Sequence, residues 1–299
     1  MKKQVCISEI GPRDGFQNVE EFIPTEVKLR IIDGIIASGV KRVQITSFVS
    51  PKAIPQMQDA GEVVTECLHK YPDTSFYALV PNLRGAENAA KHGLKEVSAV
   101  ISVSESHNMA NVKKTLDESF AQLKEMIDSF PQMHIILDAA TAFGCPVQGI
   151  TPYESLKSYM ERARVLGIDS CTVCDTIGAA SPNQVREYFT QLRKDFPEIA
   201  FGAHIHDTRN MGMFNTFVAV ECGVSHVEVA LGGLGGCPFA QGASGNTSTE
   251  DFVYMLHDMG WGTGIDFDKL LATAMYAKEH VQGNFSGHHI NITRNHRVQ

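Results

Sequence analysis

Eight short β-rich runs alternate with longer amphipathic segments along the 299-residue chain, and this alternation restricts the fold more than any other feature. The β-rich runs occupy residues 5–10, 42–48, 75–80, 96–102, 134–140, 170–175, 200–206 and 226–231. Segments with helical spacing of apolar residues lie between them, at 24–38, 60–71, 115–130, 151–166, 182–196 and 212–222. Strands that alternate with helices form parallel sheets, and eight such units can close into a barrel. We therefore expect an α/β protein with a (β/α)8 TIM barrel. The competing open, doubly wound sheet usually has fewer strands and a break in the alternation.

No linker or low-complexity tract divides the chain, so we expect residues 1–299 to form a single barrel domain. A chain of this length is usual for one such barrel. The segment 262–299 follows the last unit and forms a C-terminal extension, with a helix around 266–280 and a polar tail over 283–299.

Charge and cysteine usage exclude several kinds of partner. The formal net charge of -8 argues against nucleic acid, whose partners normally carry a basic patch. No signal peptide is evident, and no apolar run approaches the roughly 18 to 20 residues that cross a bilayer. The seven cysteines are odd in number and irregularly spaced, so a disulfide framework is not expected. We expect a cytoplasmic protein without a membrane partner, assembled as a homo-oligomer, either a dimer or a tetramer.

The clearest local signal for chemistry is the pair His204 and His206 at the end of the seventh predicted strand. Residues two apart in a strand point to the same face, with Cα atoms about 7 Å apart. Both imidazoles would face the barrel interior, where active sites of this fold lie at the carboxyl ends of the strands. The alternative is a pair of structural histidines satisfied by neighbours. Asp14, which follows the first strand, favours a shared metal ion instead.

A carboxylate and two imidazoles, with the amide oxygen of Asn246 as a further donor, would suit an octahedral Mg²⁺ or Mn²⁺. A closed zinc site would prefer thiolates. Cys171 and Cys174 are three apart on a predicted strand, so their side chains point to opposite faces and cannot chelate one ion together. We interpret both as structural cysteines.

Two further residues near the predicted metal site carry reactive groups. Cys237 follows the glycine-rich run 232–236, which lacks the phosphate-loop pattern and suits a mobile lid. A thiol there could exchange a proton with a carbanion. Arg13 is either a rim residue in an ion pair or a guanidinium that stabilises developing enolate charge.

Seven blocks of the sequence resemble the 3-hydroxy-3-methylglutaryl-CoA (HMG-CoA) lyase family, in the order that family has them. They are GPRDGFQN at 11–18, TSFVSPK at 46–52, VPNLRG at 80–85, FGCP at 143–146, DTIG at 175–178, HIHDT at 204–208 and GGLGGCPFAQGASGN at 232–246. The blocks cover nearly the whole predicted barrel, and the last is the longest and most specific. The family comprises metal-dependent lyases and condensing enzymes on a TIM barrel.

This resemblance implies a lyase that cleaves HMG-CoA, or a close 3-hydroxyacyl-CoA analogue, into acetyl-CoA and acetoacetate by a metal-assisted retro-Claisen reaction. These products belong to leucine degradation and ketone-body formation. The resemblance also implies roles for ten residues. They are Asp14, His204, His206 and Asn246 as metal ligands; Arg13, Cys237 and Asp175 in catalysis; and Gln17, Gln44 and Thr176 in substrate binding.

Four departures from the family pattern fall near the predicted site. Gln44 stands where the family usually has glutamate, and an amide cannot ionise or take a proton. Cys174 and Asn210 replace usual glycines, and the segment 138–140 also differs. We expect an altered pocket. This leaves open two other hypotheses: a related aldolase or condensing enzyme with another carboxylic acid substrate, and a metal-binding paralogue without catalytic activity.

Overall fold

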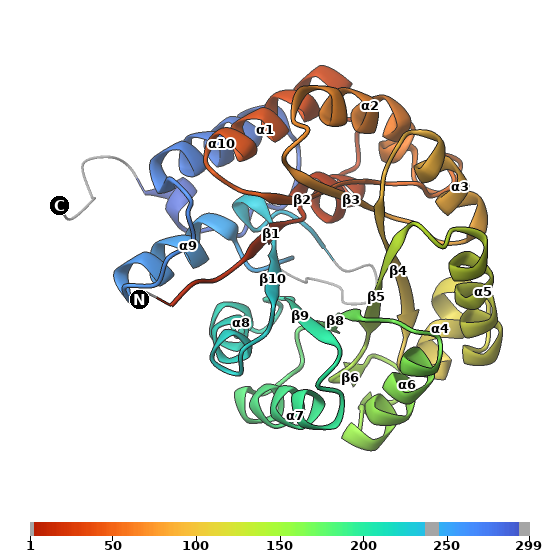
Figure 1. The fold of residues 1–299 in the computed structure, drawn as a ribbon. Helices are drawn as coiled ribbons and strands as arrows, with labels where there is room; N and C mark the ends of the chain where they lie inside the picture. The colour runs from red at the N-terminus through yellow and green to blue at the C-terminus, as the bar shows by residue number, and fades with distance from the viewer. Residues whose placement is uncertain (1–2, 237–244, 293–299) are drawn as a thin grey trace.

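The computed structural model shows a closed barrel of eight parallel strands, and it describes residues 3–236 and 245–292 (Figure 1). The barrel strands are β1 (Ile7–Glu9), β2 (Arg42–Ser47), β3 (Ser75–Leu79), β4 (Glu96–Ser102), β5 (His134–Ala140), β8 (Ser170–Asp175), β9 (Ala200–Ile205) and β10 (His226–Val229). Each strand pairs with the next barrel strand in the chain, and β10 closes the ring against β1. The predicted TIM barrel and its eight strands are confirmed.

Helices surround the barrel and cover its outer face (Figure 1). They are α1 (Thr25–Ala37), α2 (Ala60–Lys70), α3 (Leu83–Lys91), α4 (Glu105–Val112), α5 (Leu116–Ser129), α6 (Tyr153–Val165), α7 (Pro182–Asp195), α8 (Gly212–Glu221), α9 (Thr249–Asp258) and α10 (Phe267–His280). The sequence analysis did not predict α3, α4 or α9, nor the small antiparallel hairpin of β6 (Gly144–Cys145) and β7 (Gly149–Ile150). None of the helices among the described residues is long and apolar enough to cross a membrane.

Local capping explains where several helices begin. Thr115 and Glu118 form a reciprocal capping box at the start of α5, so two backbone N–H groups that the helix leaves free are satisfied. The Asn82 side chain accepts a hydrogen bond from the Gly85 N–H at the start of α3. These caps set the positions of helices whose preceding strands carry cavity residues.

The C-terminal helix α10 lies alongside α1 on the outside of the barrel (Figure 1). Gly34 of α1 faces Thr273 of α10, and a β-carbon at position 34 would lie only 2.5 Å from Thr273 Oγ1. The missing side chain therefore allows the two helices to approach closely. This contact holds the predicted C-terminal helix against the barrel.

Candidate metal centre and substrate cavity

A cavity of about 430 Å³ opens at the carboxyl ends of the barrel strands. Its polar wall contains every described residue of the predicted site except Gln44, Asp175 and Asn246. Apolar side chains from β3–β5 and the loops and helix beside them, including Val49, Ile54, Leu79 and Val100, also line the cavity, together with His107 and Asn111. The residues that line the cavity include Arg13, Asp14, Gln17, Asp138, Cys174, Thr176, His204 and His206. The cavity lies where TIM-barrel enzymes hold their substrates.

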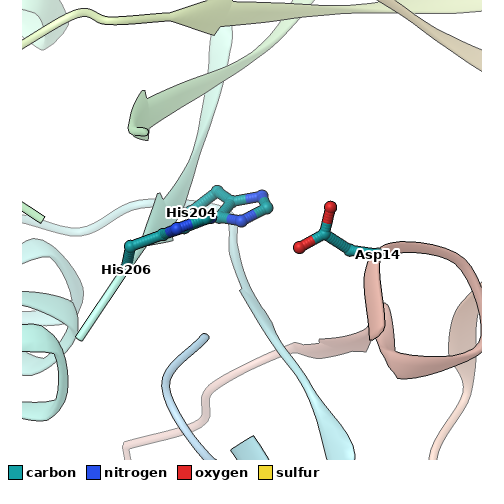
Figure 2. A group of neighbouring side chains, drawn as sticks. All are labelled: Asp14, His204 and His206. Atoms are coloured by element: carbon teal, nitrogen blue, oxygen red, sulfur yellow. The ribbon is translucent and has the colours of Figure 1, made fainter. Parts of the chain in front are cut away.

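Asp14, His204 and His206 converge on one point of this cavity (Figure 2). Asp14 lies in a π-helical turn (Gly11–Gly15) directly after β1, whereas the two histidines come from the end of β9. One potential ligand atom from each lies within 4.8 Å of the others, and all three side chains are buried. The imidazole rings stack with centroids 5.1 Å apart, as expected for residues two apart on a strand. The structure therefore brings together the three predicted ligands from distant parts of the sequence.

Asn246 joins this cluster from the segment after β10, where its backbone forms a β-bridge with His206. Its Oδ1 lies 2.9 Å from His204 Nε2, and its Nδ2 donates a hydrogen bond to Asp14 Oδ2 at 2.7 Å. Neighbouring ligands of an octahedral ion with bonds of about 2.1 Å are separated by about 3 Å. The oxygen and nitrogen therefore already have the separation that two ligands of one such ion would need.

His206 and Asp14 have the protonation states that a divalent cation requires. Burial and the neighbouring His204 together lower the pKa of His206 to about 4, so His206 is neutral at pH 7. Burial also disfavours the charged form of His204, but Glu228 outweighs this effect and raises the pKa of that histidine. Its Nδ1 is buried without a hydrogen-bond partner in the described part of the chain. Burial would raise the pKa of Asp14, but Arg13 and the histidines outweigh this effect and hold it at about 2. An anionic oxygen and a neutral imidazole are the forms that bind metals.

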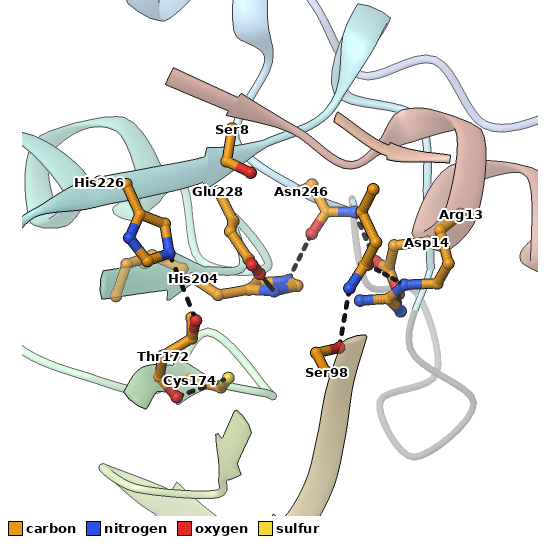
Figure 3. A network of polar contacts seen from close by, with 12 residues as sticks. Ser8, Arg13, Asp14, Ser98, Thr172, Cys174, His204, His226, Glu228 and Asn246 are labelled. Carbon is orange, nitrogen blue, oxygen red and sulfur yellow. Dashed lines mark hydrogen bonds and ion pairs between the residues drawn. The ribbon is translucent and has the colours of Figure 1, made fainter. Parts of the chain in front are cut away.

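Glu228 on β10 holds His204 from behind, and the sequence analysis did not identify it. One carboxylate oxygen accepts a hydrogen bond from His204 Nδ1 at 2.9 Å (Figure 3). The other accepts one from the Tyr77 hydroxyl at 2.7 Å. Burial opposes ionisation of Glu228, but the contact with His204 dominates and its pKa falls to about 2. A carboxylate at Nδ1 fixes the tautomer that presents Nε2 to an ion.

We predict that Glu228→Gln weakens divalent-cation binding about 10- to 100-fold, because an amide can still accept the hydrogen bond from His204 Nδ1 but lacks the negative charge that makes the liganding Nε2 more basic. Isothermal titration with Mn²⁺ measures this change. Tyr77→Phe is the matched control, since it removes only the other hydrogen bond to the same carboxylate. Equal Mn²⁺ affinity in wild type and Glu228→Gln would contradict the assigned role.

Gln44 lies behind Arg13 and does not line the cavity. Its Oε1 accepts a hydrogen bond from Arg13 Nε, and its Nε2 donates one to Ser98 Oγ at 2.9 Å. Arg13 also donates to Asp14 Oδ1. The side chain of Gln44 is fully buried. The expected direct substrate contact of Gln44 is therefore not seen; Gln44 orients the guanidinium that faces the cavity.

The structure separates the remaining predicted residues into two groups. Gln17 and Thr176 line the cavity, as predicted for substrate contacts. Asp175 does not line it: its two carboxylate oxygens accept hydrogen bonds from the backbone N–H groups of Ala179 and Ala180, at 2.9 and 3.0 Å. These two hydrogen bonds use both oxygens of Asp175 to hold the loop after β8. The position of Asp175 therefore does not support its predicted acid–base role. Cys237 lies outside the described residues.

The other departures from the family pattern also have distinct positions. Cys174 and Asp138 line the cavity, where a change of side chain alters the pocket wall. The altered pocket remains a prediction. Asn210 does not line it and has a φ of +57°. Asparagine tolerates this left-handed conformation better than other side chains, which explains why it can stand where glycine is usual. The replacement at 210 therefore keeps a backbone conformation and leaves the pocket wall unchanged.

Two buried glutamates hold the segment that leads into the glycine-rich run. Glu9 accepts hydrogen bonds from the N–H groups of Gly11 and Leu231 at 2.7 and 2.8 Å, and from Thr249 Oγ1 at 2.6 Å. Glu250 accepts one from the Gly232 N–H at 2.9 Å. Burial raises the pKa of Glu9 to about 7 and that of Glu250 to about 8, despite these hydrogen bonds.

The raised pKa of Glu9 predicts a loss of stability as the pH rises. The folded state binds this proton more tightly than the unfolded state, so the free energy of unfolding falls between about pH 4.5 and 7. The contribution is on the order of 3 kcal/mol. Glu9→Gln should remove it, and urea unfolding of both proteins across this pH range measures the difference in slope. Parallel curves for the two proteins would contradict the prediction.

A closed parallel barrel with a buried carboxylate–imidazole cluster at the carboxyl ends of its strands defines a class of (β/α)8-barrel enzymes with a candidate divalent-metal site. The HMGL-like family model matches residues 4–276. The chain therefore belongs to the HMGL-like family, the family of the HMG-CoA lyases.

Individual relatives agree with this assignment. The chain is 39% identical over 279 residues to hydroxymethylglutaryl-CoA lyase YngG of Bacillus subtilis, covering 93% of each protein. It is 38% identical to the mitochondrial hydroxymethylglutaryl-CoA lyase of Mus musculus, covering 91% of this chain and 84% of the relative. A solved structure of an HMG-CoA lyase from Acinetobacter baumannii, in complex with coenzyme A and 3-methylmalate, has a TM-score of 0.92 and 35% identity, covering 99% of this chain and 97% of that one.

Proposed function

We propose that this protein cleaves HMG-CoA to acetyl-CoA and acetoacetate. The observation that carries the proposal is the convergence of Asp14, His204, His206 and Asn246 beside Arg13 at one cavity, in a chain that matches HMG-CoA lyases over more than nine tenths of its length. The relative that binds coenzyme A and 3-methylmalate supports an acyl-CoA with a hydroxylated, carboxylate-bearing acyl group as substrate.

The four ligating residues would hold a divalent cation, which when bound supplies Lewis-acid polarisation and a counter-charge. Arg13 carries a fixed positive charge at the same wall of the cavity, because Gln44 and Asp14 both accept hydrogen bonds from it. A guanidinium held in this way stabilises the thioester enolate that forms when the C2–C3 bond breaks. Apolar side chains that also line this cavity, such as Val49, Ile54 and Val100, limit the access of water to this charge.

We assign the other predicted residues according to their positions. Gln17 and Thr176 contact the substrate, since both line the cavity. Gln44 orients Arg13, and Asp175 holds the loop that carries Thr176. Cys237 remains the candidate proton donor to the enolate, because it follows Gly236, which lines the cavity.

We predict that Cys237→Ala retains its divalent cation but cleaves HMG-CoA at least about 100-fold more slowly, because the enolate loses a positioned proton donor. Metal analysis and a coupled acetoacetate assay on the same preparation check both parts. Cys6→Ala, at an exposed cysteine before β1, serves as the matched control. Turnover equal to wild type would remove Cys237 from the mechanism.

The direct test of the proposed function is acetoacetate formation from HMG-CoA by the purified protein with Mg²⁺ or Mn²⁺. We expect turnover that chelation abolishes and added cation restores. No turnover under either metal would contradict the proposal. Activity in the Gln44→Glu variant would then show that the wild type lacks a necessary carboxylate. No activity in that variant either would favour another carboxylic acid substrate or a protein without catalytic activity.

We further propose that Mg²⁺ or Mn²⁺ is the resident ion, because the donors are oxygen and imidazole nitrogen without a thiolate among the described ligands. We propose one catalytic domain over residues 1–299, with 262–299 as its C-terminal extension, and a homo-oligomer in the cytoplasm, a dimer or a tetramer. The absence of a disulfide pattern among the seven cysteines supports a reducing compartment.

A further inference from the structure

Asp138 is a buried acidic residue in the wall of the substrate cavity, and none of the assignments above uses it. It lies on β5, where it pairs in register with Val100 of β4, and both residues line the cavity. The side chain is only 4% exposed. Asp138 therefore shares one enclosed space with Arg13 and the two histidines.

The carboxylate of Asp138 has one oxygen that the protein does not satisfy. The Ser98 side chain donates a hydrogen bond to this carboxylate, and Ser98 in turn accepts one from Gln44. However, Oδ1 of Asp138 is buried without any hydrogen-bond partner within residues 3–236 and 245–292. A buried carboxylate oxygen without a partner is costly for the folded state. A donor supplied by a ligand in the cavity would remove this cost.

The other acidic side chains around the site are already committed to protein groups. Asp14 accepts hydrogen bonds from Arg13 and Asn246 and belongs to the metal cluster. Both oxygens of Glu228 are occupied, by His204 and Tyr77, and both oxygens of Asp175 hold a backbone loop. Among the described residues, Asp138 is the acidic side chain of this cavity that retains a free acceptor.

We propose that Asp138 is a catalytic residue that accepts a hydrogen bond from the substrate hydroxyl and takes its proton when the C2–C3 bond breaks. This inference rests on the proposed lyase function. The O–H electron pair then forms the ketone C=O of acetoacetate, and the electron pair of the C2–C3 bond stays on the thioester as an enolate. One proton from a second acid, assigned above to Cys237, converts the enolate to acetyl-CoA. The proton on Asp138 returns to the Cys237 thiolate through solvent, so the cycle consumes no proton.

The electrostatic surroundings of Asp138 suit a group that both takes and releases a proton. Burial and the negative charge of Glu228 raise its pKa to about 7, while Arg13, Ser98 and His204 act in the opposite direction. A general base works best when its pKa lies near the working pH. A divalent cation bound nearby would favour the ionised form, because opposite charges lower the pKa of a carboxyl group.

The test compares Asp138→Asn with wild type and with Asp128→Asn, a control that makes the same atomic change on the exposed face of α5. We expect kcat for HMG-CoA cleavage to fall about 100-fold or more in Asp138→Asn only. Mn²⁺ content and the affinity for acetyl-CoA should stay within about threefold of wild type. This combination separates a proton-transfer defect from a collapsed site.

A second variant is needed in case the asparagine side chain of Asp138→Asn rearranges the pocket. Asp138→Ala leaves space where a small carboxylate can bind, so added formate should restore turnover in a saturable manner, and formamide should not. Two results would overturn the role of Asp138 and leave the proposed function standing. One is turnover by Asp138→Asn within threefold of an active wild type; the other is the failure of formate to rescue Asp138→Ala. No HMG-CoA cleavage by wild type itself would overturn both.

Discussion

Asp14→Ala should bind no divalent cation at concentrations that saturate wild type, and its HMG-CoA cleavage should fall about 1,000-fold or more. Asp14 supplies the negative charge of the Asp14–His204–His206 cluster, and its low pKa keeps that charge at all working pH values. Its removal also leaves Arg13 facing the ligand nitrogens without compensation, which repels a cation. His206→Ala should have the same effect on metal content, since it removes the neutral imidazole of the set.

Metal analysis of the dialysed proteins, together with Mn²⁺ titration, measures this loss directly. His134→Ala is a suitable control, because His134 lies at the start of β5, at the opposite end of the barrel, and is partly exposed. Stoichiometric metal in either Asp14→Ala or His206→Ala would show that the ion, if one binds, is held elsewhere, and the ligand assignment would have to be abandoned.

Arg13→Lys should retain the metal but reduce kcat about 1,000-fold. The guanidinium donates to Gln44 through Nε and to Asp14 through a terminal nitrogen, so its plane is set by two acceptors in different elements. Lysine keeps the charge but presents a flexible ammonium, which cannot make both contacts while facing the cavity. The enolate would then form without an oriented positive charge, whereas binding of the ground-state thioester would change little.

Steady-state kinetics with HMG-CoA separates these effects, because a group that acts on the enolate lowers kcat and kcat/KM together while KM stays constant. Arg186→Lys on the surface helix α7 provides the matched control. A rise in KM with unchanged kcat would show instead that Arg13 serves only to bind substrate, and the enolate-stabilising role would be wrong.

Local sequence patterns determined the barrel and the core of the metal cluster. All eight strands appear where β-rich runs predict them, because strands buried on both faces are read as short apolar segments between helices. The His204–His206 pair could be predicted because a strand sends alternate residues to one face, which is a property of the local backbone. The position of Asp14 after the first strand followed from the rule that strand ends of a barrel meet at one rim.

Only the tertiary structure decided which polar groups face the cavity and which serve as supports. Glu228 meets His204 because β9 and β10 pair in a particular register, and Asn246 meets Asp14 across 232 residues of chain because the barrel closes. Gln44 within β2 and Asp175 at the end of β8 were both predicted to act at the site, yet their hydrogen-bond partners hold them outside the cavity lining. Asp138 is a single acidic residue in an apolar strand, and only the packing around it shows that one oxygen was left for a ligand. Contacts between elements distant in sequence depend on register and side-chain packing, which the periodicity of each separate element does not encode.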